Sequence, residues 1–363
     1  MKKSINILIE PNAKNTYWLK NILSGINESA QKYNYRIKFI LDACLCDSSK
    51  YVCVIGSDLN WIEETVEDVI KLGLQPIIVN SSVLPIKKYN SSGVYFELSS
   101  AIEVCTSYLV SLGKSNISLV GVNKESASDL EKVDAFLSLE NKYKNTNLSI
   151  EYRISNFSDC LNNYLKKLNK DGTEGAICVN DTTAINLINA SCKNGFNLPN
   201  DLFVIGMGNS FLGKEISIPL TTVDFNYYEL GKSAVFLYHT LEKSPTDCTL
   251  KLSLPCSLIT RESTAKNPLS SKFIANTIAV AKTPSPDYDD ELGVRKIENV
   301  LQETDDLGRD IIFLIAKGYK ATQIAEKLFF TDRGLRYRIK GIMARLGCNT
   351  REELYNLLNK VLN

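Results

Sequence analysis

Apolar and polar residues alternate in two regular ways along the first 265 residues. Short β-branched runs, mostly bounded by Gly, Asn or Asp, are separated by longer stretches with the 3.6-residue apolar period of amphipathic helices. This alternation predicts an α/β fold in which parallel strands form two doubly wound, helix-covered lobes, with a ligand between them at the carboxyl ends of the strands. The predicted strands are Ile5–Ile9, Arg36–Leu41, Val52–Ile55, Pro76–Val79, Ile117–Val122, Gly175–Val179 and Leu202–Ile205.

The pattern becomes purely helical near the C-terminal end. One helix is expected to end near Lys317, because Gly318 suits a left-handed cap, and a second covers Ala321–Leu328. A third begins after Thr331, whose hydroxyl can accept a hydrogen bond from a helical amide. Its apolar stripe is Leu335, Ile339, Ile342, Met343 and Leu346, and a capping box at residues 350–353 starts a last helix with the stripe Leu354, Leu357, Leu358 and Val361. The spacing predicts a small all-α helix-turn-helix.

The opposite face of the third helix is basic and long enough to lie in a DNA major groove. From residue 295 onward there are thirteen Lys or Arg and nine Asp or Glu, whereas the whole chain has a net charge of +1. A basic helix face is usually only solvated, but the helix-turn-helix spacing favours double-stranded DNA as the partner. The candidate DNA-binding residues are Arg333, Arg336, Tyr337, Arg338 and Lys340.

Three elements of this region stand in a familiar order: Leu314–Gly318, Gln323–Leu328 and Arg345–Gly347. With them, residues 304–358 resemble the LuxR-type (GerE) helix-turn-helix domain. The resemblance implies that Arg333 and Arg336 reach base edges, that Lys340 and Arg338 hold phosphates, and that the last helix dimerises. Gly334 departs from the family, which has a better helix former there.

The region before it carries a second resemblance. Pro219–Val223, Glu229–Gly231 at a helix start, Leu254-Pro255 and Ile259–Thr264 are similar to the effector-binding domain of LacI/GalR-type repressors, over about residues 4–264. The resemblance implies the fold of periplasmic sugar-binding proteins. The DNA-binding headpiece of that family precedes the first strand, whereas this sequence starts at that strand and has its DNA-reading unit at the other end.

The same resemblance implies a set of ligand-binding residues. They are Asn15, Tyr17, Trp18, Lys132, Asn180, Asn209 and Phe225. Tyr17 or Trp18 would stack on the ligand, although Trp18 also fits a core position. Lys132 stands where the family has an arginine, Gly208 where it has an aspartate and Phe225 where it has a glutamine. A cation kept and a carboxylate lost predict a small effector that is anionic or partly apolar.

The resulting domains are a sensor at 1–265, a proline-containing linker at 266–294 and the DNA-binding domain at 295–363. The sequence has neither the phosphate loop nor the nucleophile elbow of common enzymes, and its cysteines lack zinc-site spacing. No catalytic residue, metal or cofactor is therefore expected, and His239 is expected to cap a helix or face solvent. A receiver domain would need an acidic pair after the first strand; Glu10-Pro11 is a poor substitute, and the region is about twice too long for a receiver.

Without a signal peptide or an apolar span, the chain is expected to be cytoplasmic, with reduced thiols and no membrane contact. These observations predict a one-component transcriptional regulator that binds DNA as a homodimer and responds to a small molecule. The alternative is a protein-interaction scaffold whose sensor region binds another protein.

Overall fold

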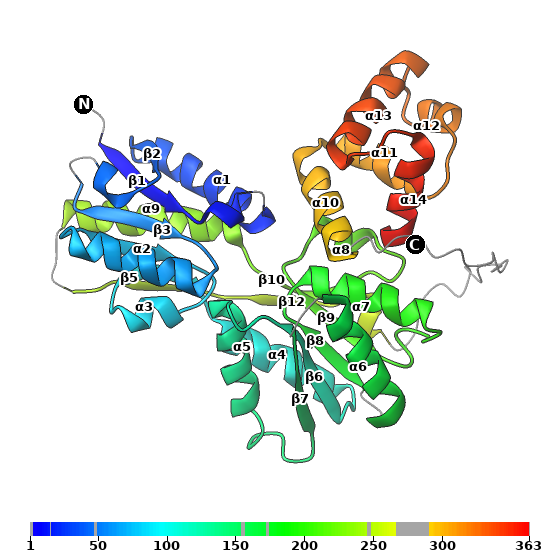
Figure 1. Ribbon diagram of the computed structural model, residues 1–363, viewed down its shortest axis with the longest axis horizontal. Coiled ribbons are helices and arrows are strands. Elements are labelled where there is room, and N and C mark those ends of the chain that lie inside the picture. The colour runs from blue at the N-terminus through cyan, green and yellow to red at the C-terminus, as the bar shows by residue number, and fades with distance from the viewer. Residues whose placement is uncertain are drawn as a thin grey trace. The chain divides into compact units, whose positions relative to one another are not determined.

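The computed structural model describes residues 3–14, 16–46, 49–153, 157–171, 174–244, 248–265 and 290–362. Asn15 and most of the predicted linker, residues 266–289, lie outside these ranges. The described chain forms two compact units (Figure 1). Unit 1 contains residues up to 113, 122–153 and 223–258, and unit 2 contains 114–121, 154–222 and 259 onward.

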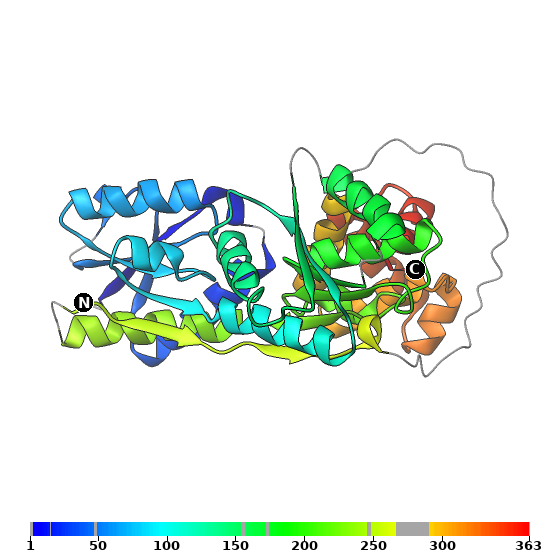
Figure 2. The same ribbon diagram turned by 90° about the horizontal axis from the view of Figure 1, so that it is seen from below.

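The first sheet has six strands in the order β11-β5-β4-β3-β1-β2. Their bounds are Lys251–Leu254, Ser92–Phe96, Gln75–Val79, Tyr51–Ile55, Ser4–Ile9 and Arg36–Ile40, and every neighbouring pair is parallel. Helix α2 (Leu59–Lys71) covers one face, while α9 (Tyr227–Lys243) packs on the other (Figure 2). A Cβ on Gly25 of α1 (Tyr17–Lys32) would lie 2.0 Å from the Tyr228 carbonyl oxygen, so glycine lets α1 and α9 pack closely.

The second sheet also has six strands, in the order β12-β10-β9-β8-β6-β7. They are Ser257–Ile259, Thr221–Asp224, Phe203–Met207, Gly175–Cys178, Asn116–Val122 and Asn147–Tyr152. The remaining helices of this α/β region are α3 (Leu84–Lys88), α4 (Leu98–Ser111), α5 (Ala127–Ser138), α6 (Phe157–Asp171), α7 (Asp181–Lys193) and α8 (Phe211–Glu215). Two parallel-dominated sheets with helices confirm the predicted fold class.

The C-terminal part of unit 2 is entirely helical. It comprises α10 (Asp290–Glu303), α11 (Asp306–Ala316), α12 (Ala321–Lys327), α13 (Asp332–Leu346) and α14 (Arg351–Leu362). The predicted helix ends are confirmed: Gly318 has φ +80°, and the Gly334 amide donates to Thr331 Oγ1 at 3.2 Å. Residues 290–294, predicted as linker, belong to α10, because Val294, Ile297 and Leu301 form a buried helical stripe.

The apolar stripe of α14 is buried within its own chain. Leu354 and Leu358 are 0% exposed and Val361 is 5% exposed, because α14 packs on α11, α10 and α7. Because residues of the same chain already bury this stripe, it no longer supports α14 as the dimerising helix.

Three further expectations concern polar and sulfur side chains. His239 neither caps a helix nor stands free in solvent: its ring stacks on Tyr33 at 4.3 Å and its Nδ1 lies 2.9 Å from the Tyr35 hydroxyl. All ten cysteines are free thiols, and burial raises the pKa of Cys53 to about 12. Within the described ranges, no helix is both long and apolar enough to span a bilayer.

Candidate functional site

A buried carboxylate joins the segments that follow β8 and β9 in unit 2 to the start of β10. Asp181 Oδ1 accepts a hydrogen bond from Thr222 Oγ1 at 2.5 Å, and its Oδ2 accepts one from the Ser210 amide at 2.7 Å. Burial raises the pKa of this carboxyl, and both hydrogen bonds oppose that shift. A Cβ on Gly206 would lie 2.4 Å from Asp181 Oδ1, so only glycine leaves room for it. Asp181 thereby fixes the loop after β9 to β10.

That loop presents Asn209, one of the predicted ligand residues. Asn209 has φ +50°, its amide donates to Thr222 Oγ1 at 3.3 Å, and its Oδ1 accepts from Arg261 Nη2 at 2.7 Å. Arg261 also donates to the Leu220 carbonyl at 2.6 Å, so its guanidinium links the loop to the residue directly before β10. Before it, Gly208 has φ +139°, a conformation that disfavours the aspartate expected from the resemblance.

Asn180 follows β8 in the same cluster and has a structural role. Its Oδ1 accepts from the Thr183 amide at 2.8 Å, which makes it the N-cap of α7, although the residue remains exposed. Unit 2 thus brings Asn180 and Asn209 together at the end of the sheet where β8 and β9 finish. Asp181, Thr222 and Arg261 lie in the same cluster. The sequence analysis did not select these last three; the Asn-Asp dipeptide after a strand was the available signal for Asp181.

The other predicted ligand residues that the structure describes lie in unit 1. Phe225 is only 5% exposed and packs on Phe96 at 5.1 Å and Tyr227 at 6.0 Å between ring centroids. Tyr17 meets the edge of Tyr227 at 6.3 Å, and Trp18 is half-buried. Phe225 therefore belongs to an aromatic group with Phe96 and Tyr227.

Lys132 is buried as one half of an ion pair. Its Nζ lies 3.1 Å from Asp129 Oδ1, one helical turn earlier on α5, and both side chains are less than 10% exposed. Asp129 Oδ2 also accepts from the Asn123 amide at 3.1 Å. An anionic ligand was predicted from a lysine without a carboxylate partner, but Asp129 supplies that carboxylate to Lys132.

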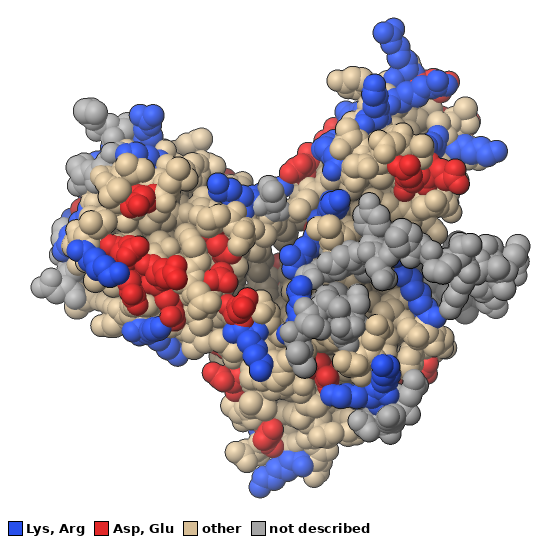
Figure 3. Space-filling model, in the orientation of Figure 1, with Lys and Arg blue, Asp and Glu red and all other residues tan. Residues whose placement is uncertain are grey.

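The basic face of α13 is largely open to solvent. Arg333, Arg336, Tyr337 and Lys340 are exposed, and Figure 3 shows Lys and Arg side chains gathered at the tip of the C-terminal helices. Arg338 differs, because its Nη1 lies 2.7 and 2.8 Å from the two carboxylate oxygens of Asp305. Its predicted role as a phosphate contact is therefore in competition with an intramolecular ion pair.

Phe329 was missed by the sequence analysis. It lies in the turn between α12 and α13, is 97% exposed and has φ +56°, an unusual conformation for a bulky side chain. The Phe-Phe pair at 329–330 was the only signal for it in the sequence, since Phe330 is partly buried against the apolar cluster of unit 2.

Comparison with known proteins agrees with this architecture. A family model described as a periplasmic binding protein-like domain matches residues 106–264. The uncharacterized HTH-type transcriptional regulator YvdE of Bacillus subtilis is 26% identical over 272 residues, covering 71% of this chain and 79% of its own length. The NTD biosynthesis operon regulator NtdR of the same organism is 36% identical over 98 residues, 26% of this chain and 29% of its own length.

Solved structures show the same fold. Transcription regulator CcpA of Lactococcus lactis aligns with a TM-score of 0.60 at 17% identity, covering 73% of this chain and 100% of its own. A LacI family transcriptional regulator from Enterococcus faecium with bound ribose aligns at 0.56 and 20% identity, over 73% and 100%. The relatives are HTH-type transcriptional regulators, and the family model ends before the C-terminal helices. The interpretation of those helices therefore depends on their structure alone.

Proposed function

We propose that this chain is a one-component transcriptional regulator in which a small-molecule sensor controls the C-terminal helix-turn-helix. The observation that carries the proposal is the exposed basic face of α13, a capped helix of 15 residues preceded by the α12 turn. The homology to transcriptional regulators supports it. The alternative, a protein-interaction scaffold, has no comparable support.

The effector site that we propose includes Asn209 and the exposed Asn180 at the sheet edge of unit 2. Amide groups of this kind bind hydroxyl and carbonyl groups, and Arg261 holds Asn209 in place for that purpose. Because neither asparagine side chain carries a charge, a neutral ligand with hydroxyl groups fits this pair better than an anion. A regulator of the same fold has been solved with ribose, which supports a ligand of this class.

Thermal stability of the full chain against a metabolite library tests the effector site. A ligand at a hundredfold excess over its Kd stabilises the folded state by about 2.7 kcal/mol. We expect Asn209→Ala to abolish the shift and Asn34→Ala to preserve it, because Asn34 also has a positive φ but is exposed in unit 1. A ligand-induced stabilisation that survives Asn209→Ala would contradict the proposed location of the site. Stabilisation by acidic metabolites alone would contradict the proposed ligand class.

Duplex selection followed by fluorescence anisotropy tests the DNA interface. Arg333→Ala and Arg336→Ala should each weaken binding to the selected duplex by about 1 to 3 kcal/mol if the arginines contact base edges. Lys340→Ala should weaken binding to every duplex by the same factor and reduce the salt dependence of the affinity. Unchanged affinity of the double arginine variant for the selected duplex would exclude α13 as the reading helix.

A further inference from the structure

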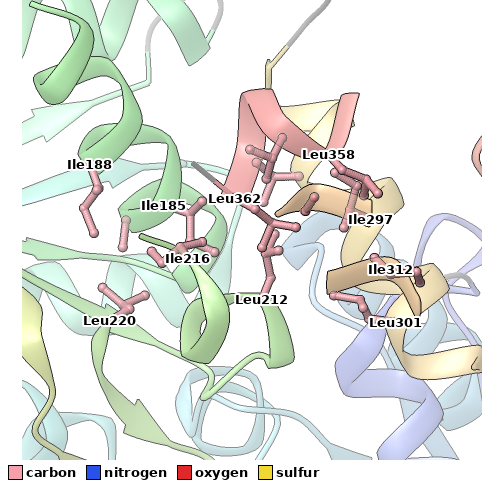
Figure 4. Close-up of a cluster of buried hydrophobic side chains, with 14 of the residues drawn as sticks. Ile185, Ile188, Leu212, Ile216, Leu220, Ile297, Leu301, Ile312, Leu358 and Leu362 are labelled. Atoms are coloured by element: carbon pink, nitrogen blue, oxygen red, sulfur yellow. The ribbon is translucent and has the colours of Figure 1, made fainter. Parts of the chain in front are cut away.

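The C-terminal helices pack directly on the sensor part of unit 2. One continuous apolar cluster joins them, and Figure 4 shows its side chains meeting between α7, α8, α10 and α14. The cluster includes Ile185, Ile188, Leu212, Ile216, Ile297, Leu301, Leu358 and Leu362. Two backbone carbonyls of α14 add polar contacts, since Leu362 accepts from the Ser217 amide at 2.8 Å and Val361 from Asn189 Nδ2 at 3.1 Å.

One charged side chain crosses this apolar contact. Glu298 of α10 is 8% exposed; its Oε1 accepts from the Phe211 amide at 3.0 Å and its Oε2 from the Leu212 amide at 2.8 Å. These amides belong to the first turn of α8 and have no partner within that helix. Gln302 Nε2 donates to Glu298 Oε1 at 2.6 Å, and the Arg309 guanidinium covers the Phe211 ring at 4.4 Å. A side chain of the helix-turn-helix region therefore caps a helix of the sensor.

The capped helix starts in the candidate effector site. Ser210 is the N-cap of α8, its amide donates to Asp181, and Asn209 directly precedes it. Only one residue thus separates Asn209, held by Arg261, from the first amide that Glu298 binds. Helix α7 provides a second connection, because it also begins at this sheet edge and packs against α10.

We propose that Glu298 is the positioning residue through which the effector loop, residues 208–211, sets the placement of α10 and the helix-turn-helix. The proposal rests on the proposed function, since it assigns the regulation of that same site. A buried carboxylate that loses both amides keeps only the hydrogen bond from Gln302, which costs free energy, so the loop and α10 favour moving together over separating. Burial raises the pKa of the Glu298 carboxyl while the Leu212 amide and Gln302 lower it, as expected for a carboxylate that depends on these donors.

Hydrogen–deuterium exchange of the full chain tests the coupling without an effector or DNA. Asn209→Ala removes the Arg261 contact and loosens the loop. We expect peptides covering residues 294–301 of α10 to exchange about threefold faster or more in this variant. When Glu298→Gln is also present, Asn209→Ala should add no further acceleration, because the carboxylate that transmits the change is absent.

Matched variants keep the experiment decisive. Asn34→Ala controls for the loss of a left-handed asparagine, and Glu303→Gln controls for a charge removed from an exposed position of α10. If Asn209→Ala fails to fold, Arg261→Lys loosens the same loop, and Glu298→Asp can replace Glu298→Gln by withdrawing the carboxylate. Equal acceleration with and without Glu298, or none in either case, would overturn the coupling.

Duplex affinity separates this proposal from the proposed function. In a chain that binds DNA, Asn209→Ala should change the anisotropy-measured Kd about threefold or more, and Glu298→Gln should remove that dependence. If the chain binds no duplex, the proposed function fails, but the exchange experiment still decides whether Glu298 couples the loop to α10.

Discussion

At the scale of single residues, partners decide the role of a charged side chain. Arg338 and Arg336 are both arginines of α13, yet Arg338 is held by the Asp305 carboxylate while Arg336 is exposed. Helical periodicity placed Arg338 on the flank of the basic face, but it could not show that the N-cap of α11 lies beside it. Asn180 gives a similar case, since its position was predicted and its capping role was not.

The Asp305–Arg338 pair has a predictable pH dependence. Arg338 holds the pKa of Asp305 below its usual value, with help from the Gly308 amide. A depressed folded-state pKa stabilises the fold above the unfolded pKa of about 3.9 and loses this effect as pH falls through the folded value. Asp305→Asn keeps an N-cap, so it should lower the Tm at neutral pH through the lost ion pair.

Thermal melts between about pH 7 and pH 2 measure this effect. The difference between native chain and Asp305→Asn should shrink as the pH falls below about 4. Asp310→Asn, an exposed change on the same helix, is the control and should show a smaller difference. A constant difference at every pH would contradict a contribution from the Asp305–Arg338 ion pair.

At the scale of elements, strands with strongly apolar sequences were predictable, whereas the short edge strands β11 and β12 were not. The β-branched strands β1, β3 and β4 are buried in the centre of the first sheet, so their apolar runs were clear. β11 and β12 are edge strands of four and three residues in which every residue is exposed or half-buried, so no apolar run marks them in the sequence. The helices of the C-terminal region were predictable because caps and glycines mark their ends.

Helix α13 contains a glycine that the fold does not require. A Cβ on Gly341 would meet no atom within 4 Å, so Gly341→Ala should stabilise the chain by about 1 kcal/mol through helix propensity. On α11, a Cβ at Gly308 would lie 2.0 Å from Thr304 Cγ2, so Gly308→Ala should be destabilising by about 1 to 3 kcal/mol. Urea unfolding measures both, and the same sign for the two changes would refute the steric argument.

At the scale of the whole molecule, one candidate for self-association is the edge of the first sheet. β2 is an edge strand, and Phe39, Leu41 and Leu45 are 56%, 90% and 51% exposed. A cavity of about 400 Å³ beside them is lined by Trp61 among others. An unpaired strand edge with exposed apolar side chains favours pairing with a second copy. Because the α14 stripe is covered, we place the proposed homodimer contact here.

Sedimentation velocity at micromolar concentration tests this contact. The native chain should sediment as a dimer and Leu41→Asp as a monomer, because a carboxylate would be buried without a partner. Leu137→Asp on α5, where the native leucine is 42% exposed, is the matched control and should leave the dimer intact. A native chain that stays monomeric with and without DNA would rule out the homodimer.

The packing of the C-terminal helices on α7 and α8 limits how chimeras of this chain can be built. A transplant of α10–α14 onto another sensor would carry Glu298 without the two amides it caps, and an apolar face without its cover. Functional chimeras should therefore need α8 and the outer face of α7 to travel with the helices. The exchangeable module of this chain should therefore extend beyond α10–α14 and include α7 and α8, on which these helices pack.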